Sequence, residues 1–123
     1  MPDEIQKTGY SLWSDACRES ILKFVKDGAG SDQILKLLSG KLDSSSKPWQ
    51  SINYVESHDD FSFVDRICGK KDREAEKFPS HLIDQVKLAL FLVLFSPGVP
   101  MISAGQDFMR HKKGVRNLSL IHI

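Results

Sequence analysis

The stretch Asn53-Tyr-Val-Glu-Ser-His-Asp-Asp60 decides how the rest of this sequence is interpreted. Its first half belongs to a run of β-forming residues that predicts a strand over 52–56. An adjacent histidine–aspartate pair, His58 and Asp59, follows directly. In parallel α/β folds, ligands bind where the strands end on their carboxyl side. The sequence therefore predicts a candidate site immediately after this strand, with Asp60 beside it.

A second strand is predicted over 99–103, and it leads into Ala104-Gly-Gln-Asp-Phe108. Because this run is apolar, we expect it to be covered on both faces. The strongest helix pattern of the chain precedes it, with Ser80 as the expected N-cap and Ser96-Pro-Gly98 as the break. This helix is apolar on nearly all sides from Leu88 onward, which predicts deep burial of its last two turns. A helical crossover between the two strands makes them parallel.

The first forty residues contain two further helix patterns. One carries an apolar stripe from Leu12 to Val25 and ends at Gly28 and Gly30. The other begins at Ser31 or Asp32, ends at Gly40 and is expected to bury three side chains, Ile34, Leu35 and Leu38. A short helix is also predicted from three apolar residues after the His–Asp pair, Phe61, Val64 and Ile67. The predicted class is thus α/β and rich in helices, and two parallel strands need neighbours that the sequence does not supply.

Composition excludes several classes of function. The chain has 123 residues, 27% of them charged, with a net charge of +1 and no block of Lys or Arg, so nothing favours nucleic acid or a membrane as partner. The longest apolar run, 88–95, is too short to span a bilayer. Cys17 and Cys68 lie in apolar helix patterns and predict buried thiols, and we expect neither a metal nor a cofactor. No signal peptide is visible, which favours a cytoplasmic location over export.

A His–Asp pair considered alone has ordinary explanations. Asp60 could cap the helix that begins at Phe61, and the pair would then lie in a surface loop. A metal-dependent phosphohydrolase would need more histidines in register, and the other histidines are poorly placed for that: His81, His111 and His122.

Four motifs together resemble glycoside hydrolase family 13, the α-amylase family. The segment 52–60 resembles the motif of barrel strand seven, and 97–108 is similar to that of strand eight. The run Arg110-His-Lys-Lys-Gly114 resembles the debranching branch, the type I pullulanases and isoamylases, as does Ser11-Leu-Trp-Ser-Asp15 with Arg18. The motifs occur in the family's order over residues 9–117.

The resemblance implies a fold and a parent enzyme. Residues 1–117 would be the carboxyl-terminal part of a catalytic (β/α)8 TIM barrel, namely strands seven and eight with their helices. Residues 118–123 would be either a strand or a non-native tail. The parent would be a retaining hydrolase of α-glucan polysaccharides or oligosaccharides, cleaving α-1,6 branch bonds in glycogen, starch or pullulan. The choice between α-1,6 and α-1,4 bonds stays open.

The resemblance also assigns roles to individual residues. Asp59 would be the third catalytic carboxylate, which stabilises the oxocarbenium-like transition state. His58 would donate a hydrogen bond to the same sugar ring. Asp60 and Asp107 would contribute to substrate binding, although the role of Asp60 is open and Asp107 could instead be a plain loop carboxylate. Arg110 and Lys112, with Phe108, would line a substrate groove or lie in a solvated loop.

The sequence departs from the family pattern in one decisive respect. A retaining glycosidase needs a nucleophile and an acid about 5–5.5 Å apart, and in this family they follow strands four and five. Neither motif is present here, so we expect the isolated chain to be inactive. Cys17 also replaces a larger residue, usually Phe. The alternatives are a small non-catalytic glucan-binding or interaction module, or a degenerate relative that binds glucan without cleaving it.

Overall fold

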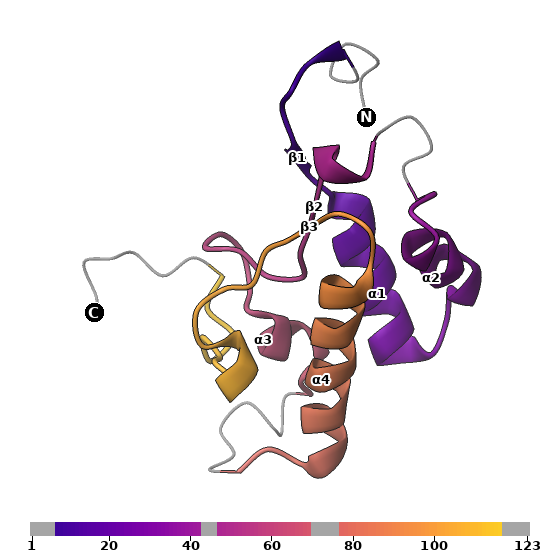
Figure 1. The fold of residues 1–123 in the computed structure, drawn as a ribbon. Coiled ribbons are helices and arrows are strands. Elements are labelled where there is room, and N and C mark those ends of the chain that lie inside the picture. Colours follow the sequence, from indigo (N-terminus) through magenta and orange to yellow (C-terminus); the bar gives the residue numbers. More distant parts are fainter. Residues whose placement is uncertain (1–6, 43–46, 70–76, 117–123) are drawn as a thin grey trace.

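The computed structural model describes residues 7–42, 47–69 and 77–116 (Figure 1). They form a mixed α/β fold with three short strands, β1 (Leu12–Trp13), β2 (Ser51–Asn53) and β3 (Val99–Pro100). Its helices are α1 (Asp15–Asp27), α2 (Ser31–Leu38), α3 (Phe63–Ile67) and α4 (Ser80–Phe95), and two 3-10 turns span Pro48–Gln50 and Gln106–Phe108. The tail 118–123 and most of the charged segment 69–78 lie outside the described residues.

The three strands form one parallel sheet in the order β1-β2-β3. Ile52 is the central residue, paired with Trp13 on one side and Val99 on the other. The predicted parallel arrangement of the strands before and after α4 is therefore confirmed. Both strands are shorter than predicted, and β3 is not covered on both faces, since Val99 is 43% exposed. A covered β3 would need a layer of structure that the described residues do not provide.

β1 is a strand at a position where the apolar pattern predicts a helix. The helix begins later, at Asp15, because Ser14 is its N-cap and accepts a hydrogen bond from the Cys17 backbone N–H at 3.1 Å. The Ser14 backbone N–H donates to the Ile52 carbonyl at 2.9 Å, which continues the pairing with β2. The apolar residues Leu12 and Trp13 thus precede the helix instead of belonging to its stripe.

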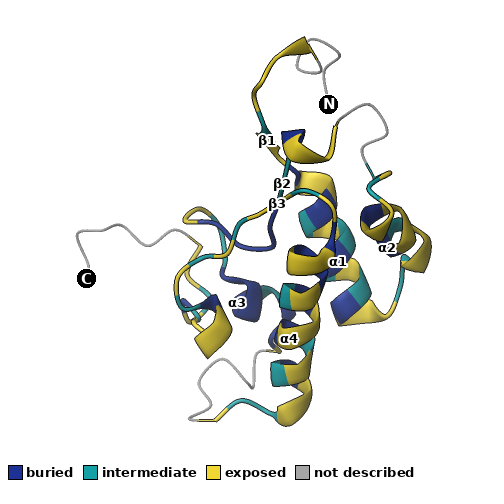
Figure 2. Cartoon of the chain, in the orientation of Figure 1, coloured by how far each residue is buried: buried dark blue, intermediate teal, exposed yellow. Residues whose placement is uncertain are grey.

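The core lies between the helices, and Figure 2 shows the buried faces of α1 and α4 turned toward the interior. α1 buries Cys17, Ile21 and Val25, and α2 packs against it. The α2 prediction was partly wrong: Leu35 and Leu38 are exposed, while Leu37 is buried with Ile34. Only one face of α2 meets α1, and that face contains positions 34 and 37.

α4 is buried on one side only. Its core face contacts α1 and α3 and consists of Leu82, Val86, Ala89, Leu92 and Val93. The prediction of deep burial for its last two turns was wrong, because four large apolar side chains there are exposed, Leu88, Phe91, Leu94 and Phe95. No described element lies over this face of the helix, and the rings of Phe91 and Phe95 stack on each other at 4.4 Å.

Candidate functional site

The predicted pair, His58 and Asp59, lies on the carboxyl side of the central strand. After β2 the chain is buried from Tyr54 to Ser57, and then it turns outward. The side chains of His58 and Asp59 are 76% and 71% exposed, and His58 Nε2 lies 3.2 Å from Asp59 Oδ2. Both side chains are therefore accessible at the position where a parallel sheet binds ligands.

The end of β1 contributes an aromatic neighbour to the pair. The Trp13 ring meets His58 edge-on, with 6.0 Å between the ring centroids, and is 45% exposed. It also contacts the buried Tyr54, whose hydroxyl donates to Asp15 Oδ1 at 2.5 Å. The apolar pattern assigns Trp13 to a helix and does not predict its place beside His58. The signal for that place is the Ser14 cap, which excludes Trp13 from the helix.

Tyr54 directly follows β2 and contacts Trp13 of β1, and it is buried next to the exposed pair. Burial and the hydrogen bond to Asp15 raise the pKa of Tyr54 to about 12. The guanidinium of Arg18 lies 5.5 Å from the Tyr54 ring centroid, and it pairs with Asp15 at 3.3 Å. The Trp13-Ser-Asp15 motif thus supports the loop that carries His58 and Asp59.

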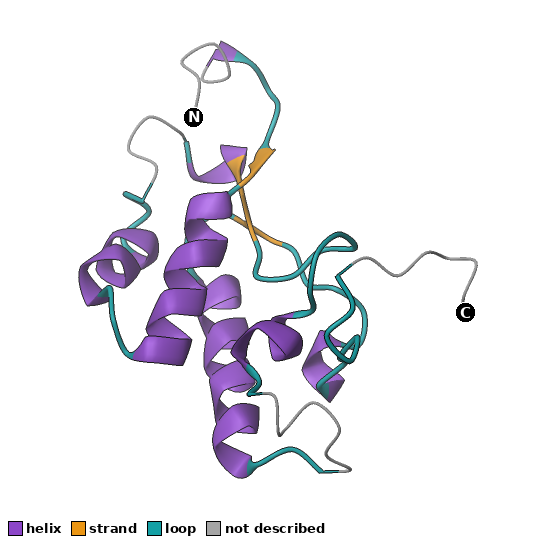
Figure 3. Ribbon diagram, turned by 180° about the vertical axis from the view of Figure 1, so that it is seen from behind, coloured by secondary structure: helices purple, strands orange, loops and turns teal. Residues whose placement is uncertain are grey.

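The segment after β3 returns to the same loop, as Figure 3 shows. The Ser103 hydroxyl donates to the Glu56 carbonyl at 3.1 Å. The Glu56 side chain is fully buried: its carboxylate accepts hydrogen bonds from the Phe63 backbone N–H, at 2.8 Å, and from the Arg110 guanidinium. The two strand ends that the sequence motifs singled out therefore meet. Neither the burial of Glu56 nor its partner Arg110 was foreseen.

Asp60 is held by two arginines. Its backbone has a positive φ of 65°, and its carboxylate pairs with Arg66 at 3.3 Å and Arg116 at 3.0 Å. Burial raises the pKa of Asp60, but the Phe61 N–H and the two guanidiniums outweigh that effect and hold it below its ordinary value. The N-cap of α3 is Ser62, so the capping role considered for Asp60 is wrong.

Asp65, on α3, organises the other side of the loop. Its buried carboxylate accepts from the Ser62 hydroxyl at 2.6 Å and from the backbone N–H groups of Lys112 and Gly114 at 2.6 and 2.8 Å. Burial raises its pKa, but these three hydrogen bonds and nearby His111 bring the pKa below its ordinary value. Lys112 itself is buried, so it neither lines a groove nor lies in a solvated loop.

Asp107 is not brought to the pair. It is exposed and lies in the 3-10 turn Gln106–Phe108, whose first residue is buried. Within the described part of the chain, the residues that line the hollow beside Asp59 do not include it; they are Arg18, Val55, Glu56, Ser57, Asp60, Phe61 and Arg66. Phe108 is 83% exposed in the same turn.

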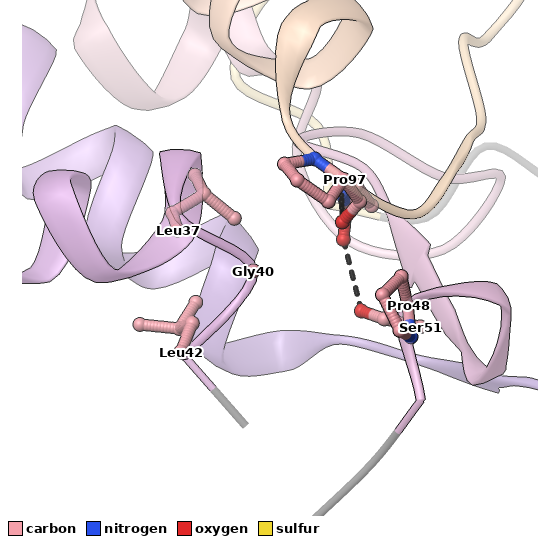
Figure 4. A pocket seen from close by; sticks show the side chains of 7 residues that line it. Leu37, Gly40, Leu42, Pro48, Ser51 and Pro97 are labelled. Atoms are coloured by element: carbon pink, nitrogen blue, oxygen red, sulfur yellow. Dashed lines mark hydrogen bonds between the residues drawn. The ribbon is translucent and has the colours of Figure 1, made fainter. Parts of the chain in front are cut away.

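The hollow beside Asp59 has no interior room for a water molecule. The cavity in Figure 4 lies at the other end of β2, between Leu37, Gly40 and Pro97, and measures about 20 Å³, roughly enough for one water. His58 and Asp59 thus lie on an open surface.

Within the ranges that the structure describes, no group of three or more His, Cys, Asp or Glu side chains could hold a metal ion. None of the described helices has the length and apolar character needed to cross a membrane.

Comparisons with known proteins agree with the motifs. No family model matches the chain. Pullulanase of Bacillus subtilis (strain 168) is 30% identical over 113 residues, which are 92% of this chain and 14% of that protein. Isoamylase of Flavobacterium sp is 30% identical over an alignment of 95 residues, and the match covers 61% of this chain and 12% of that protein. The chain therefore spans about one seventh or less of the length of these curated relatives.

Solved structures give the same result. One such structure is pullulanase from Anoxybacillus sp. LM18-11, complexed with maltotetraose. The match has a TM-score of 0.72 at 28% identity and covers 87% of this chain and 17% of the pullulanase chain. A mutant pullulanase from Paenibacillus barengoltzii, also complexed with maltotetraose, gives a TM-score of 0.73 at 26% identity over 89% of this chain and 19% of its own. Fold and relatives place the chain among the glycoside hydrolases. Within them it is related to the debranching enzymes of family 13, the pullulanases and isoamylases, and it corresponds to one part of such a protein.

Proposed function

We propose that this chain forms part of the catalytic domain of a retaining debranching enzyme that hydrolyses α-1,6 bonds in glycogen, starch or pullulan. The observation that carries the proposal is the exposed His58–Asp59 pair at the carboxyl end of the central parallel strand, in a relative of pullulanases. The solved pullulanases complexed with maltotetraose or maltotriose support an α-glucan as the ligand.

We further propose that the sheet is one sector of a (β/α)8 barrel. Its strands are adjacent in chain order, parallel and separated by helices, as consecutive strands of such a barrel are. The strands that the motifs indicate as seven and eight would be β2 and β3, and β1 would then be strand six. A complete barrel takes about 250 residues. Its other strands would pair with the edges of β1 and β3, and its other helices would cover the exposed face of α4.

In this proposal the two residues of the pair have different roles. The Asp59 carboxylate binds hydroxyl groups of the sugar ring and stabilises the positive charge that develops in the transition state. The imidazole of His58 binds the same ring, and its 3.2 Å contact with Asp59 keeps the two groups side by side. The exposed face of Trp13 offers the ring an apolar surface next to His58.

The other two acidic residues lie farther from the reaction in this proposal. The Asp60 carboxylate is occupied by Arg66 and Arg116, so its contribution to substrate binding is to hold the loop in shape. Asp107 is exposed and would contact a more distant part of a glucan chain. The isolated chain is proposed to be inactive because the nucleophile and the acid, about 5–5.5 Å apart in retaining enzymes, come from strands outside it.

The test uses a chimaera in which residues 9–116 replace the matching segment of Bacillus subtilis pullulanase. We expect it to hydrolyse pullulan, and Asp59→Asn to lower kcat at least about 100-fold. Asp84→Asn is the control, because Asp84 is exposed on α4 and its pair with Lys87 is long, at 4.0 Å. Normal turnover of the Asp59→Asn chimaera would refute the assigned role. Maltotetraose binding by the isolated chain, with an inactive chimaera, would favour a glucan-binding module instead.

A further inference from the structure

Lys112 is a buried lysine with a specific pair of partners. Its exposed fraction is 7%, which is rare for lysine unless the side chain is paired. Its Nζ donates to the His58 carbonyl at 3.0 Å and to the Asp60 carbonyl at 2.8 Å. These two carbonyls lie on either side of Asp59, so a single amino group holds the backbone before and after the proposed catalytic carboxylate.

The lysine is itself held in place from the core. Its backbone N–H donates to Asp65 Oδ2 at 2.6 Å, and the Gly114 N–H donates to the other oxygen at 2.8 Å. Asp65 belongs to α3, whose neighbouring residues Phe63 and Val64 are almost completely buried. The backbone that carries the Lys112 side chain is therefore anchored to a buried helix residue 47 positions earlier in the chain.

The side chains of His58 and Asp59 have little support of their own. Both are more than two-thirds exposed. Within the described part of the chain, these two side chains contact each other, and His58 also contacts the Trp13 ring. The direction of the Asp59 carboxylate consequently depends on the backbone that carries it. A misplacement of about 1 Å in such a group can cost about 100-fold in rate.

From this arrangement we infer that Lys112 is a positioning residue that fixes the backbone on both sides of Asp59 and thereby orients its carboxylate. The inference rests on the proposed function of Asp59. Lys112 is not a catalytic residue, because its burial keeps it from touching a sugar. It acts through two carbonyl groups, and its effect should appear in turnover and not in substrate affinity.

The first experiment measures amide hydrogen exchange in the full 123-residue chain and needs no enzymatic activity. Lys112→Met keeps most of the side-chain length and removes the donors, whereas Lys113→Met changes an exposed neighbouring lysine. We expect Lys112→Met to speed exchange in a peptide covering 57–61 at least about tenfold. Lys113→Met should leave this peptide unchanged. Unchanged exchange in Lys112→Met, or an equal increase in α4, would overturn the inference, since the second result means a general role in folding.

The second experiment measures pullulan hydrolysis by the chimaera. Lys112→Met is expected to lower kcat at least about tenfold while KM stays within about twofold. In an Asp59→Asn background, Lys112→Met should lower kcat no further, because both substitutions remove the same contribution of the Asp59 carboxylate. Independent, multiplicative losses would overturn the inference while leaving the role of Asp59 intact. Normal turnover of Asp59→Asn alone, with a loosened 57–61 segment in Lys112→Met, would instead reject the proposed function.

Discussion

The buried carboxylate of Glu56 pairs with the guanidinium of Arg110, 54 residues farther along the chain. The other carboxylate oxygen accepts from the Phe63 N–H at 2.8 Å. Glu56 thus joins the segment after β2 to the start of α3 and to the segment that follows β3. This one carboxylate connects three segments that must keep their relative positions for the site to exist.

Truncation of Glu56 is the first prediction. Glu56→Ala leaves the Phe63 N–H buried without its acceptor and Arg110 without its partner, so we expect a loss of about 3 kcal/mol in the free energy of unfolding. Urea unfolding followed by circular dichroism measures it. Glu19→Ala is the matched control, since Glu19 pairs with Arg18 and Arg66 at an exposed position and should cost less than about 1 kcal/mol. Equal losses in both variants would contradict the importance of the buried pair.

Gly98 supplies the second prediction. A Cβ at this position would lie 2.5 Å from Asn53 Nδ2, and its φ is 149°. Asn53 cannot move away easily, because it is buried and donates to the Pro97 carbonyl at 3.1 Å. We expect Gly98→Ala to destabilise the fold by about 2–3 kcal/mol, measured by urea unfolding.

Two other glycines separate the causes of that loss. Gly28 has a φ of 66° with open space around it, so Gly28→Ala should cost about 1 kcal/mol from backbone strain alone. Gly9 has neither a clash nor a positive φ, and Gly9→Ala should be nearly neutral. If Gly98→Ala costs no more than Gly28→Ala, the close packing against Asn53 is not what requires glycine.

The sequence predicted those parts of the fold that depend on local pattern. The apolar periodicity of α4 and the β-forming residues before His58 are such patterns, and a helix between two strands implies that they are parallel. The place of His58 and Asp59 at a strand end followed from the same local order. Burial could not be predicted in the same way, because it depends on which other elements cover a helix or strand. Phe91 and Phe95 are as apolar as the core residues of α4, yet they are exposed.

The supporting contacts of the site could not be predicted for a different reason. Lys112 and Glu56 are charged residues, and such residues are usually exposed. Their burial is stabilised by partners 47 to 54 residues away, Asp65, the His58 carbonyl and Arg110. No periodicity in the sequence indicates partners at such distances. β1 was missed on local grounds, because its two apolar residues continue the stripe of α1.

Acid stability is the third prediction and concerns Asp65. Its pKa in the folded chain lies below the ordinary unfolded value of about 3.9, so the carboxylate contributes stability above that pH. The contribution should be lost as the pH falls from about 4 through the lower folded pKa. We expect Asp65→Asn to be less stable at pH 7 and to show a weaker decline in stability below pH 4. Urea midpoints between pH 2 and 7 measure this, with Asp84→Asn as the exposed control.

A parallel acid decline in Asp65→Asn and the unmodified chain would contradict this assignment. Asp60 also has a lowered pKa, because Phe61 N–H, Arg116 and Arg66 outweigh its burial. If Asp65→Asn leaves the acid decline unchanged, Asp60→Asn should be measured by the same urea midpoints between pH 2 and 7. The two variants separate the acid stability that comes from Asp65 on α3 from the acid stability that comes from Asp60 and its two arginines.

The fourth prediction concerns substrate binding by Trp13. If one face of its ring packs on a sugar held by His58 and Asp59, Trp13→Ala in the chimaera should raise KM for pullulan about 3–10-fold, with a smaller effect on kcat. Trp13→Phe should retain much of the affinity, because a flat apolar ring remains. The control is Trp49→Ala, since Trp49 is 58% exposed and its ring lies near Lys47. An unchanged KM in Trp13→Ala, or an equal rise in Trp49→Ala, would exclude a direct contact between Trp13 and the sugar.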